Sequence, residues 1–225
     1  MRRTKIVCTI GPASNNEETM EKMLEAGMNV ARLNFSHGTH EEHKKTIDRF
    51  RKVRDKMEVS AAVMLDTKGP EIRLRLFENG GAFLKEGDTF VLTTEEVMGN
   101  EKRVTISYKD LPTQVYEGVR ILLDDGKISM IVKETNEKEI TCIVENGGEL
   151  KNRKSINIPN FPLDMPYLSE ADKADLLFGI ENDVDYIAAS FVRSRADVVA
   201  LRKFLDYNGG HTIKIIAKIE NMQGV

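Results

Sequence analysis

The stretch AAVMLDTKGPEIR, residues 61–73, decides the fold, because its character changes half-way along. Residues 61–65 are apolar without interruption, as in a parallel strand that is covered on both faces. The run ends at Asp66, and Thr67, Lys68 and a Gly-Pro break follow directly. Polar residues at the carboxyl end of a buried strand are typical of the mouth of an α/β barrel.

Similar units precede and follow this stretch. Strands are predicted from apolar runs at residues 5–10, 28–36, 61–65, 185–192 and 213–219. Helices are predicted to begin at the capping motifs Ser14-x-x-Glu17, Thr39-x-x-Glu42, Ser169-x-x-Asp172 and Ser194-x-x-Asp197. Strands that alternate with helices indicate an α/β protein with a parallel sheet.

The region between residues 74 and 157 has a different pattern, because its hydrophobic period falls towards two. Gly-Gly pairs and Asp125-Gly126 supply turns, so we interpret the Asp-Gly pair as a hairpin and not as a metal site. We expect an inserted all-β barrel here, followed by a stiff linker that contains Pro159, Pro162 and Pro166. The expected domains are residues 1–70, 71–167 and 168–225.

Five parallel strands do not close an eight-stranded barrel. Either the sheet is open, or the sequence is part of a longer barrel. We favour the second reading, because an exposed parallel edge at residues 213–219 would invite association. The expected fold class is therefore α/β, a partial (β/α)8 TIM barrel with an inserted all-β barrel domain.

The composition excludes several classes of protein. The chain has 225 residues, 40% of them hydrophobic and 31% charged, with a formal net charge of -3, which argues against a nucleic-acid partner. The apolar run after the basic start is too short for a signal peptide or a membrane span, so we expect a cytoplasmic location. Cys8 and Cys142 have no CxxC or Cys/His context and are interpreted as buried thiols.

Side-chain alternation along the second strand separates polar from apolar residues. Arg32, Asn34 and Ser36 share one face, and the apolar residues between them share the other. In a barrel the polar set points inward at the mouth, where we expect a ligand, an anion or a metal to satisfy it. The alternative is an internal pair between Arg32 and Asp66.

The last strand repeats this arrangement, because Lys218 and Glu220 are two residues apart and share a face. They could be part of a site. The alternatives are a structural ion pair, or a Glu220 that caps the next helix. Cations beside carboxylates, with Lys68 and Arg73 included, suit a phosphorylated, carboxylated substrate and a divalent metal. No nucleophile has an attached base, so covalent catalysis is not expected.

The histidines at the start of the second helix are a possible cluster. His40 and His43 lie in or beside its first turn, next to two glutamates. We interpret them as solvated helix surface.

Five motifs together resemble the pyruvate kinase family, in its order and spacing. They are CTIGPAS (residues 8–14), NVARLNFSHG (29–38), LDTKGPEIR (65–73), SFVRS (190–194) and IAKIEN (216–221). The resemblance implies a transferase that moves the phosphoryl group of phosphoenolpyruvate to ADP in the last step of glycolysis. It also implies a (β/α)8 barrel with a β-barrel lid after the third strand, where the all-β region lies.

The resemblance implies roles for individual residues. Its catalytic residues are Lys218, Arg32 and Arg73, of which Arg32 and Lys218 bind the substrate. The nucleotide-binding residues that it implies are Asn34, His37, Arg73 and Lys154. It implies a potassium ion on Asn34, Ser36, Asp66 and Thr67, and Mg²⁺ or Mn²⁺ on Glu220.

Glu71 is the residue of potassium-dependent members, so the resemblance predicts potassium dependence. Two departures from the family pattern matter. Ser155 replaces a glycine of the family's lid hinge and stiffens it. A second metal carboxylate, three strands and an allosteric domain would lie beyond Val225. We therefore expect an amino-terminal fragment with little turnover, from a family whose full-length members are homotetramers. The alternatives are a non-catalytic β module and another magnesium-dependent enolpyruvate enzyme.

Overall fold

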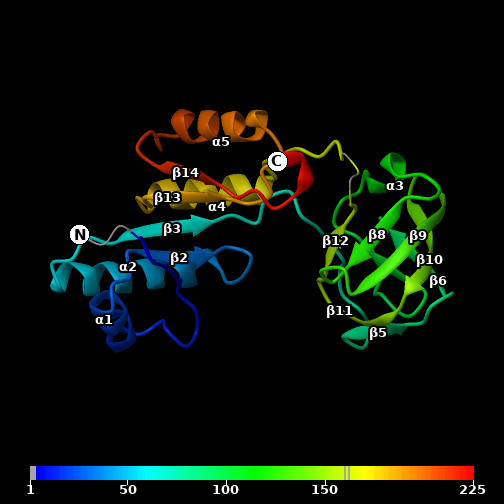
Figure 1. The fold of residues 1–225 in the computed structure, drawn as a ribbon, viewed down its shortest axis with the longest axis horizontal. Helices are drawn as coiled ribbons and strands as arrows, with labels where there is room; N and C mark the ends of the chain where they lie inside the picture. Colours follow the sequence, from blue (N-terminus) through cyan, green and yellow to red (C-terminus); the bar gives the residue numbers. More distant parts are fainter. Residues whose placement is uncertain (1–3, 160, 162) are drawn as a thin grey trace. The chain divides into compact units, whose positions relative to one another are not determined.

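The computed structural model describes residues 4–159, 161 and 163–225 (Figure 1). The chain forms two compact units. The first consists of the segments up to Pro70 and from Pro166 onward, and the second consists of Glu71–Met165. Pro162, expected in the linker, lies outside the described residues.

The first unit contains a five-stranded parallel sheet with the strand order β1-β2-β3-β13-β14. Its strands are β1 (Val7–Thr9), β2 (Val30–Asn34), β3 (Ala62–Asp66), β13 (Tyr186–Ala189) and β14 (Lys214–Ala217). Its helices are α1 (Glu17–Glu25), α2 (His40–Lys56), α4 (Glu170–Glu181) and α5 (Arg195–Tyr207), with a short η1 (Met222–Gly224). The predicted alternation of parallel strands and helices is confirmed.

The core of this unit explains the alternation seen in the sequence. Ala31 and Leu33 of β2 are buried with Ile47 and Phe50 of α2, in a core to which all four helices contribute. The opposite face of the sheet carries a much smaller apolar cluster, which includes Met64. Period-two alternation therefore separates a face buried against the helices from a face that is left for polar side chains.

The helix starts agree with three of the four predicted capping motifs. Thr39 and Ser169 form complete capping boxes, and Ser194 accepts a hydrogen bond from the backbone N–H of Asp197. The prediction at Ser14 is wrong, because Asn16 is the N-cap of α1 and accepts from Thr19 N at 2.9 Å. Ser14 instead belongs to a turn, in which it accepts from Gly11 N at 3.0 Å.

The second unit is an all-β structure with one short helix, α3 (Leu111–Gln114). Its main sheet has the order β4-β12-β8-β9-β10-β6-β7, and β11 pairs with β5. The strands are β4 (Ile72–Arg73), β5 (Gly81–Leu84), β6 (Thr89–Thr93), β7 (Arg103–Thr105), β8 (Arg120–Leu123), β9 (Ile128–Thr135), β10 (Glu139–Asn146), β11 (Gly148–Lys151) and β12 (Ser155–Asn157). They enclose their own apolar core.

The Asp-Gly pair forms the hairpin that the sequence predicts. It joins the antiparallel strands β8 and β9, and Asp125 and Gly126 both have positive φ. The two cysteines differ from each other. Cys142 is fully buried in this unit, and burial raises the pKa of its thiol to about 12. Cys8 is only half-buried, so the expectation of a buried thiol is wrong there, because β1 is an edge strand.

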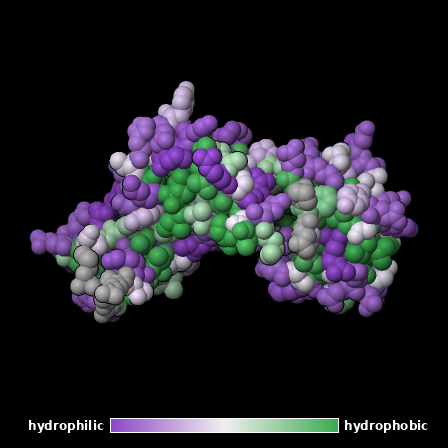
Figure 2. All heavy atoms as spheres, turned by 45° about the horizontal axis from the view of Figure 1, so that its top comes forward, coloured by the Kyte–Doolittle hydropathy of each residue, from purple (hydrophilic) through white to green (hydrophobic). Residues whose placement is uncertain are grey.

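On the face shown in Figure 2, hydrophilic side chains cover much of the periphery of each unit, and apolar side chains are visible on both units. Val7 of β1 is 47% exposed and Ile216 of β14 is 41% exposed. These are the two edge strands of the parallel sheet, so both edges expose apolar side chains. Within the described residues, none of the helices has the length and apolar character that a bilayer crossing needs.

Candidate active site

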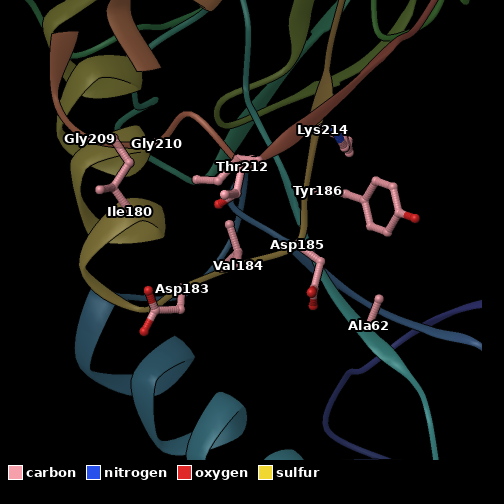
Figure 3. Close-up of a pocket in the computed structure, with 11 residues that line it drawn as sticks. Ala62, Ile180, Asp183, Val184, Asp185, Tyr186, Gly209, Gly210, Thr212 and Lys214 are labelled. Atoms are coloured by element: carbon pink, nitrogen blue, oxygen red, sulfur yellow. The ribbon is translucent and has the colours of Figure 1, made fainter. Parts of the chain in front are cut away.

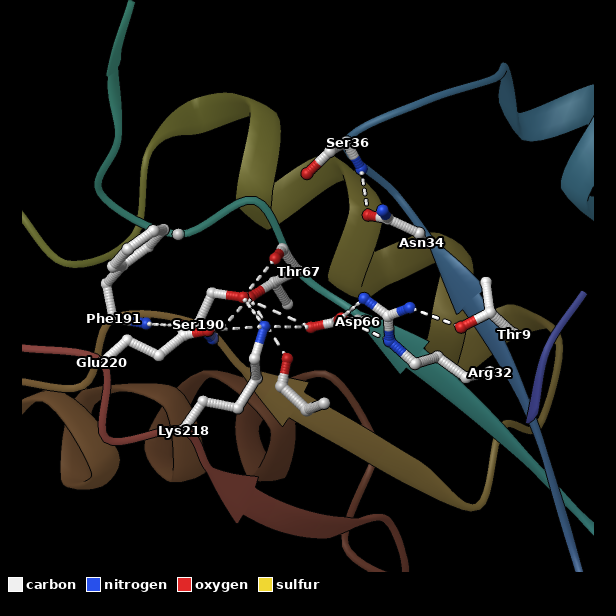
Figure 4. A network of polar contacts seen from close by, with 12 residues as sticks. Thr9, Arg32, Asn34, Ser36, Asp66, Thr67, Ser190, Phe191, Lys218 and Glu220 are labelled. Carbon is white, nitrogen blue, oxygen red and sulfur yellow. Dashed lines mark hydrogen bonds and ion pairs between the residues drawn. The ribbon is translucent and has the colours of Figure 1, made fainter. Parts of the chain in front are cut away.

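A polar network lies at the carboxyl ends of the parallel strands (Figure 4). The register places Arg32 of β2 beside Thr9 of β1, and Asp66 at the end of β3 beside Asn34. Arg32 Nε donates to Asp66 Oδ2 at 2.6 Å, and its Nη1 donates to Thr9 Oγ1 at 2.6 Å. The guanidinium thus spans three neighbouring strands.

Lys218 reaches the same carboxylate from the other side. It follows β14, and its Nζ lies 3.0 Å from Asp66 Oδ1 and 3.3 Å from Glu220 Oε1. Glu220 Oε2 accepts from the backbone N–H of Phe191 at 3.0 Å. Asp66 is 1% exposed, so a buried carboxylate is shared by two cations that each remain partly open to solvent.

Ser190 is a member of this network that sequence reasoning missed. It accepts from Lys218 Nζ at 2.8 Å and donates to the backbone oxygen of Thr67 at 2.6 Å. Tyr167 donates to its carbonyl at 3.0 Å, and burial raises the pKa of that phenol, which keeps it protonated. Ser190 directly follows β13. The predicted strand, residues 185–192, extends past Ser190, so the rule that identified Asp66, a polar residue just after a buried strand, does not single it out.

The remaining residues predicted in the first unit lie close by. Asn34 Oδ1 accepts from the backbone N–H of Ser36 at 3.0 Å, and Thr67, which is 5% exposed, accepts from Ser190 N at 3.2 Å. His37 is exposed in the loop after β2. The structure therefore brings Arg32, Asp66, Thr67, Lys218 and Glu220 into one connected group, with Asn34 and Ser36 on the neighbouring strand end.

Two predicted residues belong to the second unit. Arg73 donates to Glu71 Oε2 at 2.9 Å and to the carbonyl of Arg153 at 2.8 Å. Lys154 Nζ lies 2.8 Å from Asp124 Oδ1. Hydrogen bonds from Lys154 and then Lys127 hold the pKa of Asp124 below its ordinary value. Both predicted cations therefore have acidic partners within their own unit.

A family model described as pyruvate kinase, barrel domain, matches residues 1–225 of the chain. The chain belongs to the pyruvate kinase family. Curated pyruvate kinases from Staphylococcus haemolyticus (strain JCSC1435) and Geobacillus stearothermophilus are each 48% identical to it, over 227 and 226 aligned residues. The alignments cover 100% of this chain, and they cover 39% and 38% of those two proteins, respectively.

These matches bear on the fold as well as on the family. The barrel-domain model and the five-stranded parallel sheet confirm the predicted class, a partial (β/α)8 barrel with an all-β insertion. The chain spans less than two fifths of the length of these pyruvate kinases.

The histidines of α2 lie at the surface as interpreted, and His40 is exposed, but both make contacts within their unit. His40 Nε2 lies 2.6 Å from Asp175 Oδ1, and the His43 ring stacks on Phe35 with centroids 4.0 Å apart. Both contacts arise because Phe35 and α4 cover the first turn of α2. Lys68 also lies beside Asp175, with Nζ 3.2 Å from Oδ2, and so belongs to this second cluster.

The donor atoms of the polar network around Asp66 indicate which cations it could bind. Amide, hydroxyl and carboxylate oxygens of Asn34, Ser36 and Asp66 are hard ligands of the kind that bind alkali and alkaline-earth ions. Within the described part of the chain, no group of three or more His, Cys, Asp or Glu side chains forms a cage for a metal. A divalent ion at Glu220 would therefore take most of its ligands from elsewhere, as Mg²⁺ commonly does from water and phosphate.

A cavity of about 470 Å³ lies at the opposite end of the parallel strands from the polar network (Figure 3). Its lining includes Ala62, Tyr186 and Lys214, which are the first residues of β3, β13 and β14. It is therefore at the amino ends of the strands, where barrel folds carry stabilising contacts and not their active sites. We place the candidate active site at the network around Asp66.

Proposed function

We propose that the natural protein carrying this chain is a pyruvate kinase, which transfers the phosphoryl group of phosphoenolpyruvate to ADP and yields pyruvate and ATP. The observation that carries the proposal is the convergence of Arg32 and Lys218 on the buried carboxylate of Asp66. This arrangement holds two cations on either side of one carboxylate, at the carboxyl ends of the parallel strands. Family membership supports the reaction.

The residue types suit phosphoryl transfer. The transition state is loose and spreads negative charge over the equatorial oxygens, so fixed cations stabilise it. We assign Arg32 and Arg73 to the phosphoryl oxygens and Lys218 to the charge that develops in the transition state. We assign Asn34, His37, Arg73 and Lys154 to the nucleotide.

We further propose K⁺ and Mg²⁺ or Mn²⁺ as cofactors. Potassium would bind to Asn34, Ser36, Asp66 and Thr67, whose oxygen donors fit it. The divalent ion would bind to Glu220 and neutralise charge on the phosphoryl group. Glu71, the residue of potassium-dependent members, supports the requirement for K⁺.

The second unit is proposed to be the lid of this enzyme, with boundaries near residues 71–167. Its closure would bring Lys154 to the nucleotide, and the Lys154–Asp124 ion pair would have to yield for that contact. Ser155, in place of a hinge glycine, restricts the backbone at this position. A homotetramer in the cytoplasm is the assembly and location that we propose for the natural protein.

The test is a coupled assay with phosphoenolpyruvate, ADP, Mg²⁺ and K⁺, on the natural protein carrying this sequence. Lys218→Met should lower turnover on the order of 10²–10³-fold, the usual effect of removing one group that stabilises transition-state charge. The affinity for the divalent metal, measured by titration, should change much less. Lys214→Met is the matched control, because Lys214 is exposed and begins the strand that Lys218 directly follows.

Wild-type protein without phosphoryl transfer would refute the proposed function. Equal turnover of Lys218→Met and Lys214→Met would refute the role of Lys218 alone.

A further inference from the structure

We propose that Asp175 is a positioning residue that ties together the two loops on which the proposed cation site depends. We call residues 35–39 the β2 loop and residues 67–70 the β3 loop. The β2 loop carries Ser36 and His37, and the β3 loop begins with Thr67. We call the contacts of Asp175 with these two loops the brace. The catalytic consequence of the brace rests on the proposed function, whereas the brace itself does not.

Asp175 is placed to hold both loops at once. It lies on α4, and its side chain is 6% exposed. One carboxylate oxygen, Oδ1, is 2.6 Å from His40 Nε2, and the other, Oδ2, is 3.2 Å from Lys68 Nζ. A buried carboxylate requires such partners, because an unpaired charge in the interior is costly.

His40 connects Asp175 to the β2 loop through contacts between aromatic rings. The His40 ring packs on Phe178 of α4, with centroids 4.7 Å apart, and Phe35 stacks on His43 at 4.0 Å. His43 Nε2 lies 2.8 Å from the His37 carbonyl. The first residue of the β2 loop and its central backbone are therefore held by the first turns of α2.

Lys68 connects the β3 loop to Asp175, and a second carboxylate of α4 also binds this loop. Asp172 is 1% exposed and accepts from the backbone N–H of Gly69 at 3.1 Å. Gly69 has a φ of +70°, and a Cβ there would lie 2.7 Å from the carbonyl oxygen of Ser190. The β3 loop is thus confined between α4 and the end of β13.

The two loops contain two of the proposed potassium ligands, Ser36 and Thr67, and directly follow the other two. Asn34 directly precedes the β2 loop, and Asp66 directly precedes the β3 loop. A coordination site tolerates displacements of only about 0.5 Å before it loses its geometry. Releasing either loop from α4 should therefore weaken potassium binding more than it slows the chemical step.

Hydrogen–deuterium exchange on the natural protein tests the brace. The reporters are the hydrogen-bonded amides of Phe35, His37, Thr67 and Gly69. Asp175→Asn should speed exchange at least about tenfold in both loops and leave α5 within twofold. Asp197→Asn is the matched control, since Asp197 is also a buried helix carboxylate but binds Arg193. It should leave both loops unchanged.

Two further variants test the His40 contact and the Lys68 contact separately, and they remain informative if Asp175→Asn does not fold. His40→Gln should loosen the β2 loop more than the β3 loop, and Lys68→Met should do the reverse. Exchange that stays within twofold of wild type in both loops, or that rises equally throughout the first unit, would overturn the brace.

The functional consequence is measured separately. Asp175→Asn should raise the K⁺ concentration for half-maximal activity at least about fivefold, with turnover at saturating K⁺ within about threefold of wild type. An unchanged K⁺ requirement in a variant with loosened loops would overturn the positioning role. If wild-type protein shows no phosphoryl transfer, the proposed function fails, and the exchange data still decide the brace.

Discussion

Asp66 is the residue on which the polar network depends, because it is buried and is contacted by cations from two directions. A buried carboxylate without partners would be costly, and Asp66 would keep one cation even if the other were removed. The positions of Arg32 and Lys218 are therefore set by the folded chain before any ligand arrives.

Glu71 gives a prediction about the proposed potassium requirement. Its carboxylate lies 2.8 Å from Arg73 Nη2. Glu71→Lys should relieve the requirement, because the new ammonium group supplies the positive charge that potassium would bring. The measurement is turnover in K⁺-free buffer, with Glu71→Gln as the control that adds no cation. A variant with an undiminished potassium requirement would contradict this role of Glu71.

His43 gives a prediction about pH. Burial lowers its pKa below the ordinary value of 6.5. The unfolded chain therefore binds more protons than the folded chain between pH 6.5 and the lowered folded-state pKa. This residue's contribution to stability is present above pH 6.5 and is lost as the pH falls through its folded-state pKa. His43→Gln does not titrate, so its free energy of unfolding should depend less on pH between about 8 and 5.5. Parallel curves for the two proteins would contradict the assignment.

The sequence predicted much of the site at this scale, for a definite physical reason. Carboxyl ends of parallel strands meet at one edge, so Arg32, Asp66, Lys218 and Glu220 could be grouped without coordinates. It did not predict that Lys68 would turn to α4. That choice depends on Asp175, which is more than a hundred residues away in the chain.

The helices show how local rules compete at the scale of elements. Both Ser14 and Asn16 are residues that commonly cap helices. Ser14 lies within the turn that closes on Gly11, so it is not free to cap α1, and Asn16 takes that place. A motif search finds the candidates, but the turn before the helix selects one of them.

This competition predicts the effect of a substitution in α1. Asn16→Ala should lower the free energy of unfolding of the first unit by about 1 kcal/mol, the usual loss for an N-cap side chain. Glu17→Ala should have a smaller effect, because Glu17 takes part in an exposed ion pair with Lys52 and not in a capping box. Urea unfolding measures both. A larger loss for Glu17→Ala would favour the original capping box, which needs a Glu or Gln side chain at this position.

The whole molecule consists of two units, each with its own core. The change of hydrophobic period along the sequence predicted the β character of the second unit. It could not predict the order β4-β12-β8-β9-β10-β6-β7, because pairings between distant strands leave little trace in local patterns. The first and last strands of the unit, β4 and β12, pair with each other through Ser155 and Arg73.

That pairing predicts that the second unit folds alone. A polypeptide of residues 71–165 has its two ends on adjacent strands and retains the complete apolar cluster of this unit. It should give a β-type circular dichroism spectrum and unfold cooperatively in urea. A control in which buried Phe90 and Leu92 are both replaced by Ala should not unfold cooperatively. A gradual transition of the unaltered polypeptide would contradict its independence.

The four charges around Ser190 have one more consequence. Arg32 and Lys218 are matched by Asp66 and Glu220, so the cluster is formally electroneutral before anything binds. A multivalent anion gains little long-range attraction from such a cluster and would leave it with excess negative charge. Counter-ions that enter with the anion would restore the balance. Anion affinity and cation affinity should therefore rise together, by reciprocal thermodynamic linkage.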